Sequence, residues 1–285
     1  MAVPSAGYLG KITSWGSSGD DCYQLVTNGF SPYKYELKVS AQPLDITSYG
    51  SSGVVSRAYT AQLGTWEVAI SGRFPKATPK LGNQGLVSVG GSALALVQGW
   101  TLNLSWATFD ITAQAASGPT WRSMRPGILL ASGTVDLQLD SGAAATLPAV
   151  AGAASSAFVL KLTEDGTNDN SFTFNGRLND LGISSSVDGM NLGKYGFQPT
   201  GDITCIGSST TSNILPCSTT GVVVDIPDWD NDGDGVPDRS LVFQSDSGRT
   251  YTGAAFLKSL SITCRVDQVI EVVATAQGCG ALTVA

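Results

Sequence analysis

The sequence predicts an all-β protein, and three observations support this fold class. The 285 residues include 34 glycines and only 14 % charged residues, a composition that suits short strands and turns better than long helices. Apolar and polar residues alternate from Tyr35 to Val39, which is the period of a strand with one buried face. Two stretches of this kind also recur along the chain. We therefore expect two related β-sandwich or β-barrel domains, each assembled from duplicated units.

The first repeated unit covers residues 35–57 and returns, at a constant offset of 65, as residues 100–122. We name these copies a1 and a2. The positions identical in both are Leu37/Leu102, Ser40/Ser105, Asp45/Asp110, Ile46/Ile111, Thr47/Thr112, Ser52/Ser117, Gly53/Gly118 and Arg57/Arg122. With a slip of four residues the match continues from 64–70 to 133–139, so we expect these two segments to be equivalent strands.

The second repeated unit, which we name b1 and b2, recurs at an offset of 79. Matching positions are Phe172/Tyr251, Thr173/Thr252, Leu178/Leu257, Leu181/Leu260, Ile183/Ile262, Val187/Val266, Asp188/Asp267, Gly201/Gly280 and Thr204/Thr283. Each copy follows a short apolar segment, 158–162 or 241–243, through a glycine-containing turn, which predicts a hairpin.

The order a1–a2–b1–b2 allows two ways of forming domains. In the nested arrangement, a2 and b1 form a continuous domain over 99–204, and a1 (34–74) joins b2 (240–285) in a discontinuous one. In the interleaved arrangement, a1 completes b1 and a2 completes b2 through a crossing. Nesting uses the shorter connection and is preferred. Residues 1–33 form a Gly/Ser-rich arm able to pack on a neighbouring body, and residues 205–239 form an insertion without a counterpart.

Composition argues against an enzyme. No histidine occurs, which removes the commonest general base and the commonest zinc ligand. There is no Gly-x-Ser-x-Gly elbow and no phosphate-binding loop. The five cysteines form an odd set without Cys-x-x-Cys spacing, so we expect neither a disulfide framework nor a zinc ribbon. These are Cys22, Cys205, Cys217, Cys264 and Cys279.

Charge and hydropathy narrow the partners further. A net charge of −7 excludes nucleic-acid binding by charge attraction. The first residues contain no basic and apolar stretch of a secretion signal, and no apolar run of 18 residues follows. We therefore expect a soluble protein made in the cytoplasm, without a membrane partner.

The sharpest local motif lies in the insertion and resembles the front of a calcium-binding loop. Acidic side chains at alternate positions converge on one ion, Gly235 makes the sharp turn, and Val236 offers its carbonyl. The acidic positions are Asp230, Asp232, Asp234 and Asp238. An EF-hand would need a glutamate where Leu241 stands, and the stretch looks more like the calcium loops of thrombospondin type 3 repeats. A structural Ca²⁺ site and a solvated acidic turn are the two interpretations.

Two acid–base pairs recur with the a unit: Asp45 with Arg57, and Asp110 with Arg122. Neither pair has a histidine, a cysteine or a second carboxylate in register, so an active site is not indicated. We expect each to be an ion pair that ties a loop to a strand.

The paired Leu-x-[Val/Leu]-Ser…Asp-Ile-Thr…Arg units and the Leu-x-x-Leu-x-Ile-[Ser/Thr]-x-x-Val-Asp units cover roughly half of the chain. With the absent histidine and the weak charge, they resemble a major tail (tube) protein of a long-tailed bacteriophage. The resemblance implies a β-sandwich whose hairpins join those of neighbours into a closed inner barrel. Three copies of a two-domain chain would make the usual six-domain ring, and rings would stack into a tube. Ring and tube closure would remove exposed sheet edges.

The same resemblance implies a place and partners for the protein. These are other copies of itself, other tail proteins, and DNA that passes through the lumen without specific binding. The protein would be assembled in the host cytoplasm and reside in the virion tail, and the net acidity agrees with an acidic lumen. A calcium-dependent adhesion or carbohydrate-binding β-sandwich and a capsid decoration protein are the alternatives.

Overall fold

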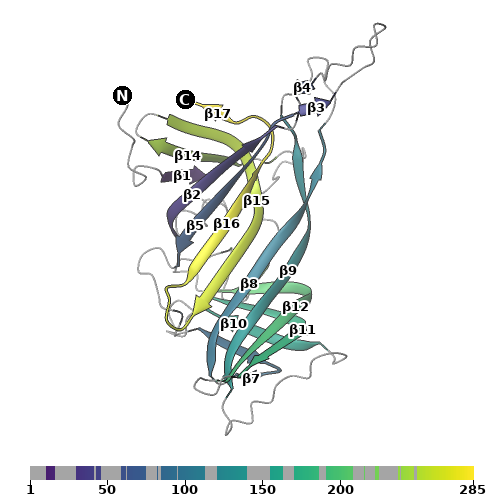
Figure 1. Cartoon of the computed structure of the whole chain (residues 1–285), viewed down its shortest axis with the longest axis vertical. Coiled ribbons are helices and arrows are strands. Elements are labelled where there is room, and N and C mark those ends of the chain that lie inside the picture. The colour runs from purple at the N-terminus through teal and green to yellow at the C-terminus, as the bar shows by residue number, and fades with distance from the viewer. Residues whose placement is uncertain are drawn as a thin grey trace.

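The structure of the protein is a computed structural model, and every regular element longer than one residue that it describes is a strand (Figure 1). The described residues are 11–16, 30–41, 43–45, 59–61, 63–74, 82, 85–94, 96–112, 121–139, 155–162, 170–185, 191–207, 215, 222–224, 237, 239–246 and 249–285. The predicted all-β class is therefore confirmed. Among these residues, no helix is long and apolar enough to cross a membrane.

The strands are β1 (Lys11–Trp15), β2 (Ser31–Ser40), β3 (Pro43–Asp45), β4 (Tyr59–Ala61), β5 (Thr65–Arg73), β6 (Leu86–Val89), β7 (Ser92–Ala93), β8 (Val97–Asp110), β9 (Met124–Leu139), β10 (Ser156–Lys161), β11 (Ser171–Ser184), β12 (Asn191–Ile206), β13 (Val222–Val223), β14 (Ser240–Asp246), β15 (Arg249–Arg265), β16 (Glu271–Gly278) and β17 (Thr283–Val284). A two-stranded sheet, β3–β4, stands apart from the main one. β1, from the expected arm, pairs with β14 of its own chain.

One antiparallel sheet of fifteen strands runs through both halves of the molecule. Its main path is β2-β5-β16-β15-β8-β9-β12-β11-β10-β6-β7, and β1, β13, β14 and β17 branch from it. This path does not close on itself. The barrel alternative for the two domains is therefore wrong for the chain by itself, because no pairing among the described strands joins the two ends.

Long strands bend out of this sheet and create a second layer in each half. The first part of β15 pairs with β14 and β17, and its second part pairs with β16 and β8. β12 likewise pairs with β9 through Asn191–Phe197 and with β13 near Thr204. The strands that leave the main sheet cross over it and cover one of its faces (Figure 1). Each half is thus a small two-layer sandwich.

Large side chains fill the space between the layers. In the half that contains β15, Tyr35 packs edge-on against Phe243 with ring centroids 5.4 Å apart, and its hydroxyl donates to the carbonyl of Gln244 at 2.7 Å. In the other half, the rings of Phe158, Phe174 and Phe197 stack on one another at 5.4 Å. The burial of these aromatic rings supplies much of the driving force for folding.

Eight strands of the main sheet form two successive groups of four with the same internal pairing. In the first group, β2-β5-β16-β15, Leu37 pairs with Val68 and Val68 with Ala276. The second group is β8-β9-β12-β11, in which Leu102 pairs with Gly133, and Gly133 with Phe197. The two pairing schemes differ throughout by 65 residues in the a strands and 79 in the b strands.

Irregularities in the pairing also repeat at these offsets. The β2–β5 register shifts between Pro32 and Lys34, and the β8–β9 register shifts between Val97 and Gly99. The b strands behave in the same way, with shifts at Leu178/Asp180 in β11 and at Leu257/Ser259 in β15.

The expected four-residue slip between 64–70 and 133–139 is wrong. Ile70 pairs with Tyr35 while Val135 pairs with Trp100, so the offset of 65 persists through these strands. A slip of four residues keeps every side chain on its original face, so the alternation in the sequence cannot reveal the error. The pairing partners decide it.

The strand pairing places a1 beside b2, through β5–β16, and a2 beside b1, through β9–β12. A third pairing, β15–β8, joins the two halves from Ser259 opposite Ser105 to Arg265 opposite Gly99. The nested domain boundaries proposed from the sequence remain a prediction, because one sheet continues through both halves.

Candidate functional site

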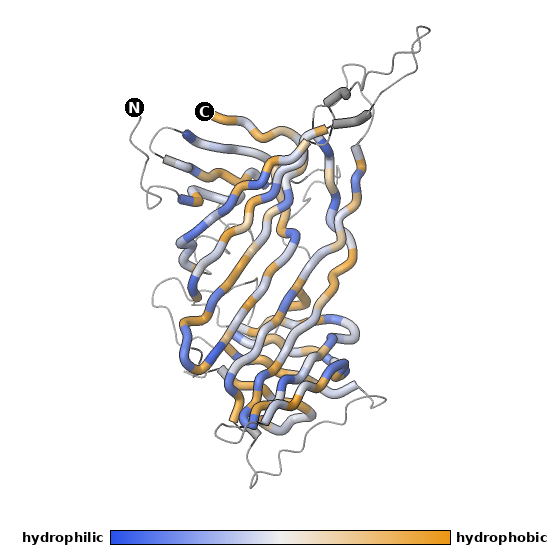
Figure 2. Tube along the Cα trace, in the orientation of Figure 1, coloured by the Kyte–Doolittle hydropathy of each residue, from blue (hydrophilic) through white to orange (hydrophobic). Residues whose placement is uncertain are grey.

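The most extensive candidate site is a face of the eight-stranded part of the sheet, β2-β5-β16-β15-β8-β9-β12-β11. Side chains alternate along each strand, as Figure 2 shows in the changes between hydrophobic and hydrophilic residues. One set is buried against the second layers, for example Leu102, Val135 and Ile262. The other set is half-buried or exposed and is covered by no described element. We refer to this second surface as the uncovered face.

The centre of the uncovered face carries hydroxyl and amide groups without charge. They lie on three neighbouring strands: Thr101, Asn103 and Ser105 on β8; Ser132 and Thr134 on β9; Ser259, Ser261 and Thr263 on β15. Ser261 Oγ donates to Asn103 Oδ1 at 2.7 Å, and Ser105 Oγ donates to the carbonyl of Leu130 at 3.4 Å. The groups therefore partly satisfy one another and leave the surface polar but neutral.

Charged residues on the uncovered face lie around this centre, with acids and bases opposite or beside each other. Lys258 forms an ion pair with Glu67. Glu271 pairs with Arg73 along β16–β5, and Asp136 pairs with Lys194 along β9–β12. Cross-strand neighbours of opposite charge stabilise a sheet modestly and cancel each other's field.

The net acidity of the chain does not come from the described residues, because basic side chains outnumber acidic ones among them. The acidic ones are Glu36, Asp45, Glu67, Asp110, Asp136, Asp180, Asp202, Asp246, Asp267 and Glu271. The basic ones are Lys11, Lys34, Lys38, Arg73, Arg122, Arg125, Lys161, Arg177, Lys194, Arg239, Arg249, Lys258 and Arg265. An acidic uncovered face, as the total charge had indicated, is therefore not what these strands present.

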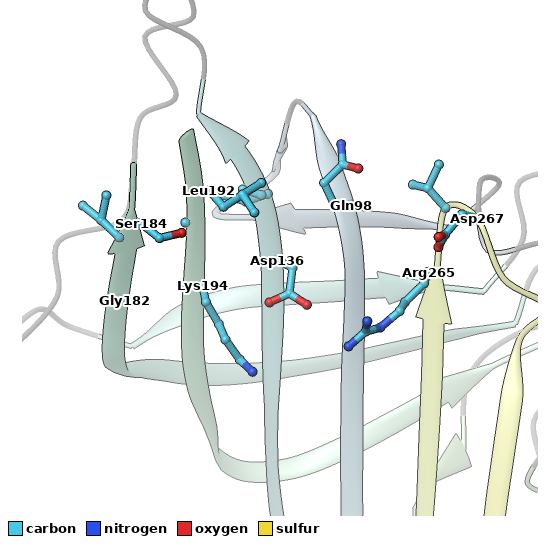
Figure 3. A pocket seen from close by; sticks show the side chains of 12 residues that line it. Gln98, Asp136, Gly182, Ser184, Leu192, Lys194, Arg265 and Asp267 are labelled. Atoms are coloured by element: carbon cyan, nitrogen blue, oxygen red, sulfur yellow. The ribbon is translucent and has the colours of Figure 1, made fainter. Parts of the chain in front are cut away.

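A hollow of about 680 Å³ opens at one end of this face (Figure 3). Arg265 extends across Gly99, where an added Cβ would lie 2.9 Å from its Cγ. Ile183 on β11 and Leu192 on β12, both exposed, contribute apolar surface to it. No histidine or cysteine lines the hollow, so the residues present provide a docking surface more readily than acid–base chemistry.

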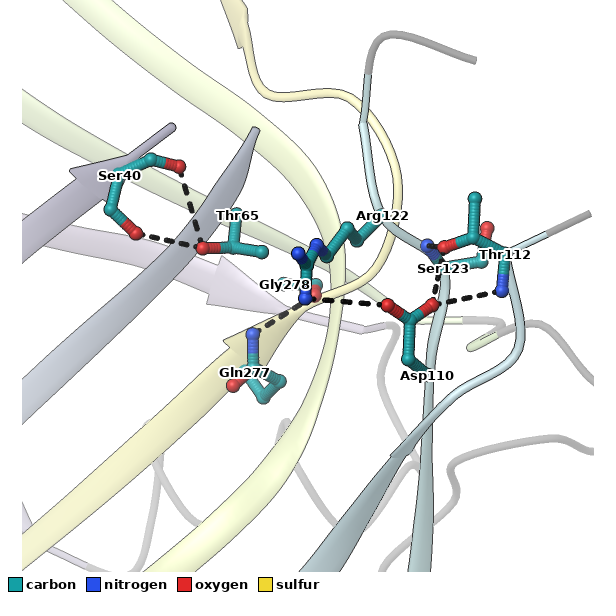
Figure 4. Close-up of polar contacts among 8 residues, drawn as sticks. All are labelled: Ser40, Thr65, Asp110, Thr112, Arg122, Ser123, Gln277 and Gly278. Carbon is teal, nitrogen blue, oxygen red and sulfur yellow. Dashed lines mark hydrogen bonds and ion pairs between the residues drawn. The ribbon is translucent and has the colours of Figure 1, made fainter. Parts of the chain in front are cut away.

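The predicted partners Asp110 and Arg122 are brought together by β8 and the start of β9. Arg122 Nη1 lies 3.4 Å from Asp110 Oδ2 (Figure 4). Thr112 donates to Asp110 Oδ1 twice, from its hydroxyl at 2.6 Å and from its backbone N–H at 3.0 Å. These two bonds hold the pKa of Asp110 below its usual value. Desolvation by burial opposes them, and the Arg122 guanidinium adds a smaller lowering effect.

Thr112→Val should lower the free energy of unfolding by about 1–2 kcal/mol, because the hydroxyl also accepts the N–H of Ser123 at 2.8 Å. Arg122→Gln should cost less than about 1 kcal/mol, because the ion pair is solvent-exposed. Urea denaturation of the two variants measures the difference.

The same comparison predicts a pH dependence. The depressed pKa of Asp110 stabilises the fold above its ordinary value of 3.8, and this contribution is lost as the pH falls through the folded-state pKa. The difference in the free energy of unfolding between the wild type and Thr112→Val should therefore become smaller in acid. A larger cost for Arg122→Gln than for Thr112→Val would contradict this assignment.

The other predicted site residues lie partly or wholly outside the described part of the chain. Asp45 ends β3, but its side chain and its expected partner Arg57 are outside it. So are the five residues of the calcium-like loop: Asp230, Asp232, Asp234, Val236 and Asp238. Among the described residues, no cluster of three or more His, Cys, Asp or Glu side chains is arranged to hold a metal ion.

Two of the described cysteines, Cys205 and Cys264, differ in their chemical state. Cys205 is disulfide-bonded, and its partner lies outside the described residues. A single disulfide is not the framework that the sequence argued against, and spacing alone cannot show which cysteines a fold brings together. Cys264 is free and buried, and burial raises the pKa of its thiol to about 12. The thiol is therefore neutral and unreactive at physiological pH.

Sequence reasoning missed the two edges of the eight-stranded sheet. Among the described strands, β2 pairs only with β5, and the second half of β11 pairs only with β12. Exposed apolar side chains lie on both, namely Tyr33 and Val39 on β2 and Ile183 on β11. The signal was available in the repeats, because the counterparts of Val39 and Ile183, which are Leu104 and Ile262, are also apolar.

Comparisons with known proteins add little. No protein-family model matches the chain, and no curated protein sequence does so. Among solved structures, it is similar to the tail tube of SPP1, determined by solid-state NMR and cryo-electron microscopy. The TM-score is 0.33, with 16 % identity, over 56 % of this chain and 96 % of that chain. A TM-score this low does not establish a shared fold, so the similarity by itself says nothing about the function of this chain.

Proposed function

We propose that the protein is a non-enzymatic virion component that polymerises into rings stacked as the tail tube of a long-tailed bacteriophage. One observation carries the proposal: in the described part of the chain, the group of eight strands is uncovered on one face and ends in two edges without a further strand partner, β2 on one side and the second half of β11 on the other. Unpaired edges invite addition of another chain, and closure into a ring removes them. The tail-tube resemblance in the repeated units supports the same proposal.

The dimensions of such a ring suit a conduit. Three copies contributing eight strands each would close a barrel of about 24 strands. With strands about 4.8 Å apart and tilted about 40°, the backbone circle would be roughly 48 Å across. Subtracting side chains leaves room for a DNA duplex. A trimer of two-sandwich chains is thus the proposed ring, and other tail proteins would contact its ends.

The uncovered face would line the lumen in this arrangement. Its hydroxyl and amide centre offers no cluster of cations to hold phosphates, and its peripheral charges are balanced across the strands. Phosphate neutralisation dominates nucleic-acid affinity, so a neutral face allows DNA to pass without specific binding. The proposed non-adhesive property comes from neutrality, not from an excess of acid.

Electron microscopy of the purified protein tests the proposal. We expect rings or hollow tubes, and we expect light scattering to give a trimer as the smallest closed species. A monodisperse monomer that binds a glycan in calcium would instead support an adhesion module. Attachment to capsid shells without tube formation would support a decoration protein.

Calcium binding by the acidic loop remains a proposal from the sequence. Carboxylates this close in the chain repel one another until a cation neutralises them, so calcium should raise the melting temperature. The double variant Asp232→Asn/Asp234→Asn should remove the effect, whereas Asp136→Asn, a matched change on β9, should not. Titration calorimetry that detects no heat of binding at millimolar calcium would contradict it.

A further inference from the structure

The junction between the two halves of the sheet provides an internal template for contact between copies. Where the groups of four strands meet, β15 pairs antiparallel with β8. By the offsets that hold throughout the sheet, β15 corresponds to β11 and β8 corresponds to β2. The two unpaired edges of the chain are therefore the counterparts of the two strands that already pair inside it.

Burial at these corresponding positions differs sharply. Ile262 is 0 % exposed at the internal junction, and its counterpart Ile183 on β11 is 61 % exposed. Leu104 is 1 % exposed, and its counterpart Val39 on β2 is 52 % exposed. Apolar character is kept at both edges although no described residue covers it. Such side chains are explained if a partner buries them.

We infer that β2 of one copy pairs antiparallel with β11 of the next copy, in the register of the β15–β8 junction. Ile262 opposite Leu102 places Ile183 opposite Leu37 of the neighbour. Ser261 opposite Asn103 places Gly182 opposite Lys38 of the neighbour. This inference rests on the proposed ring and specifies which residues meet in it.

The sheet faces restrict the alternatives to this register. Leu37 packs against the core and Lys38 lies on the uncovered face, so a slip of one residue would turn apolar groups outward. Slips of two residues preserve the faces and would place Ile183 opposite Tyr35 or Val39, so it is the register of the β15–β8 junction that selects Leu37. The shift at Leu178/Asp180, which β15 repeats at Leu257/Ser259, fixes the point at which the two edges can begin to align.

Disulfide trapping tests the register. The chain carrying both Lys38→Cys and Gly182→Cys should form covalent oligomers under mild oxidation, because directly opposite residues have Cβ atoms about 4.5–5.5 Å apart. Gly182 tolerates the change, since an added Cβ would meet nothing within 4 Å. The control Lys38→Cys/Ser184→Cys places the thiols diagonally, about 7–8 Å apart, and should cross-link at least about tenfold more slowly.

An internal pair calibrates the chemistry. Asn103→Cys/Ser261→Cys occupies the corresponding positions inside one chain, and it should oxidise within the monomer at a similar rate. If rings form by electron microscopy but the Ser184 pair cross-links faster than the Gly182 pair, or neither cross-links, the register is refuted while the ring stands. If the wild-type protein forms neither rings nor tubes, the proposed function fails and this inference fails with it.

Discussion

Replacing Trp66 with alanine is expected to lower the free energy of unfolding by about 3–5 kcal/mol, the usual cost of truncating a fully buried aromatic side chain. Trp66 on β5 is only 1 % exposed. Its ring lies against Gly253 and Gly278, where an added Cβ would come within 2.4 Å and 2.1 Å of ring atoms. The indole N–H donates to the carbonyl of Gly280 at 3.1 Å. Truncation leaves a cavity between the layers and an unpaired carbonyl.

Trp121→Ala is the matched control. This second tryptophan covers Gly64 but is only half-buried, so we expect its truncation to lower the free energy of unfolding by about 1–2 kcal/mol. Equilibrium denaturation in urea, followed by circular dichroism, measures both variants. Equal costs would show that the contact of Trp66 with the two glycines is not the centre of packing that the structure indicates.

Proline in the edge strand β2 is expected to abolish assembly. Lys38 and Val39 are both exposed, and consecutive residues of a strand direct their N–H groups to opposite sides. One of Lys38→Pro and Val39→Pro therefore removes a bond to β5, and the other removes a donor from the free edge. Whichever variant loses the donor on the free edge should keep its melting temperature within a few degrees and yet form no tubes.

Thermal unfolding and electron microscopy on the two variants separate these effects. Lys38→Ala and Val39→Ala, which keep every backbone donor, serve as controls and should still assemble. Tubes of normal length from both proline variants would show that β2 is not an edge used in polymerisation.

The strand register shows where sequence reasoning stops. Alternating residues and recurring positions predicted the all-β class and the offsets of 65 and 79 that the pairing follows. They could not detect that a slip of four residues was wrong, because an even slip leaves every face unchanged. Only the partner across the strand, Val68 for Leu37 and Gly133 for Leu102, distinguishes the two alignments.

The local polar contacts were likewise predicted only in part from the sequence. Asp110 and Arg122 were recognised as a pair because both recur with the a unit, yet the closest contacts of Asp110 are with Thr112, two residues away. The disulfide of Cys205 could not be predicted either, because the distance between cysteines in space is not encoded in their spacing along the chain.

By itself, the sequence determined the fold class, the repeated units and which face of each strand is apolar, since these follow from alternation and recurrence along the chain. The tertiary structure decided that the two groups of strands join into one open sheet, and that β2 and the second half of β11 form the edges of this eight-stranded part among the described strands. Strand order depends on hydrogen bonds between segments far apart in the chain, which no local pattern specifies. The exposure of Val39 and Ile183 is known only from the tertiary structure, because the burial of a side chain depends on which residues lie next to it in space.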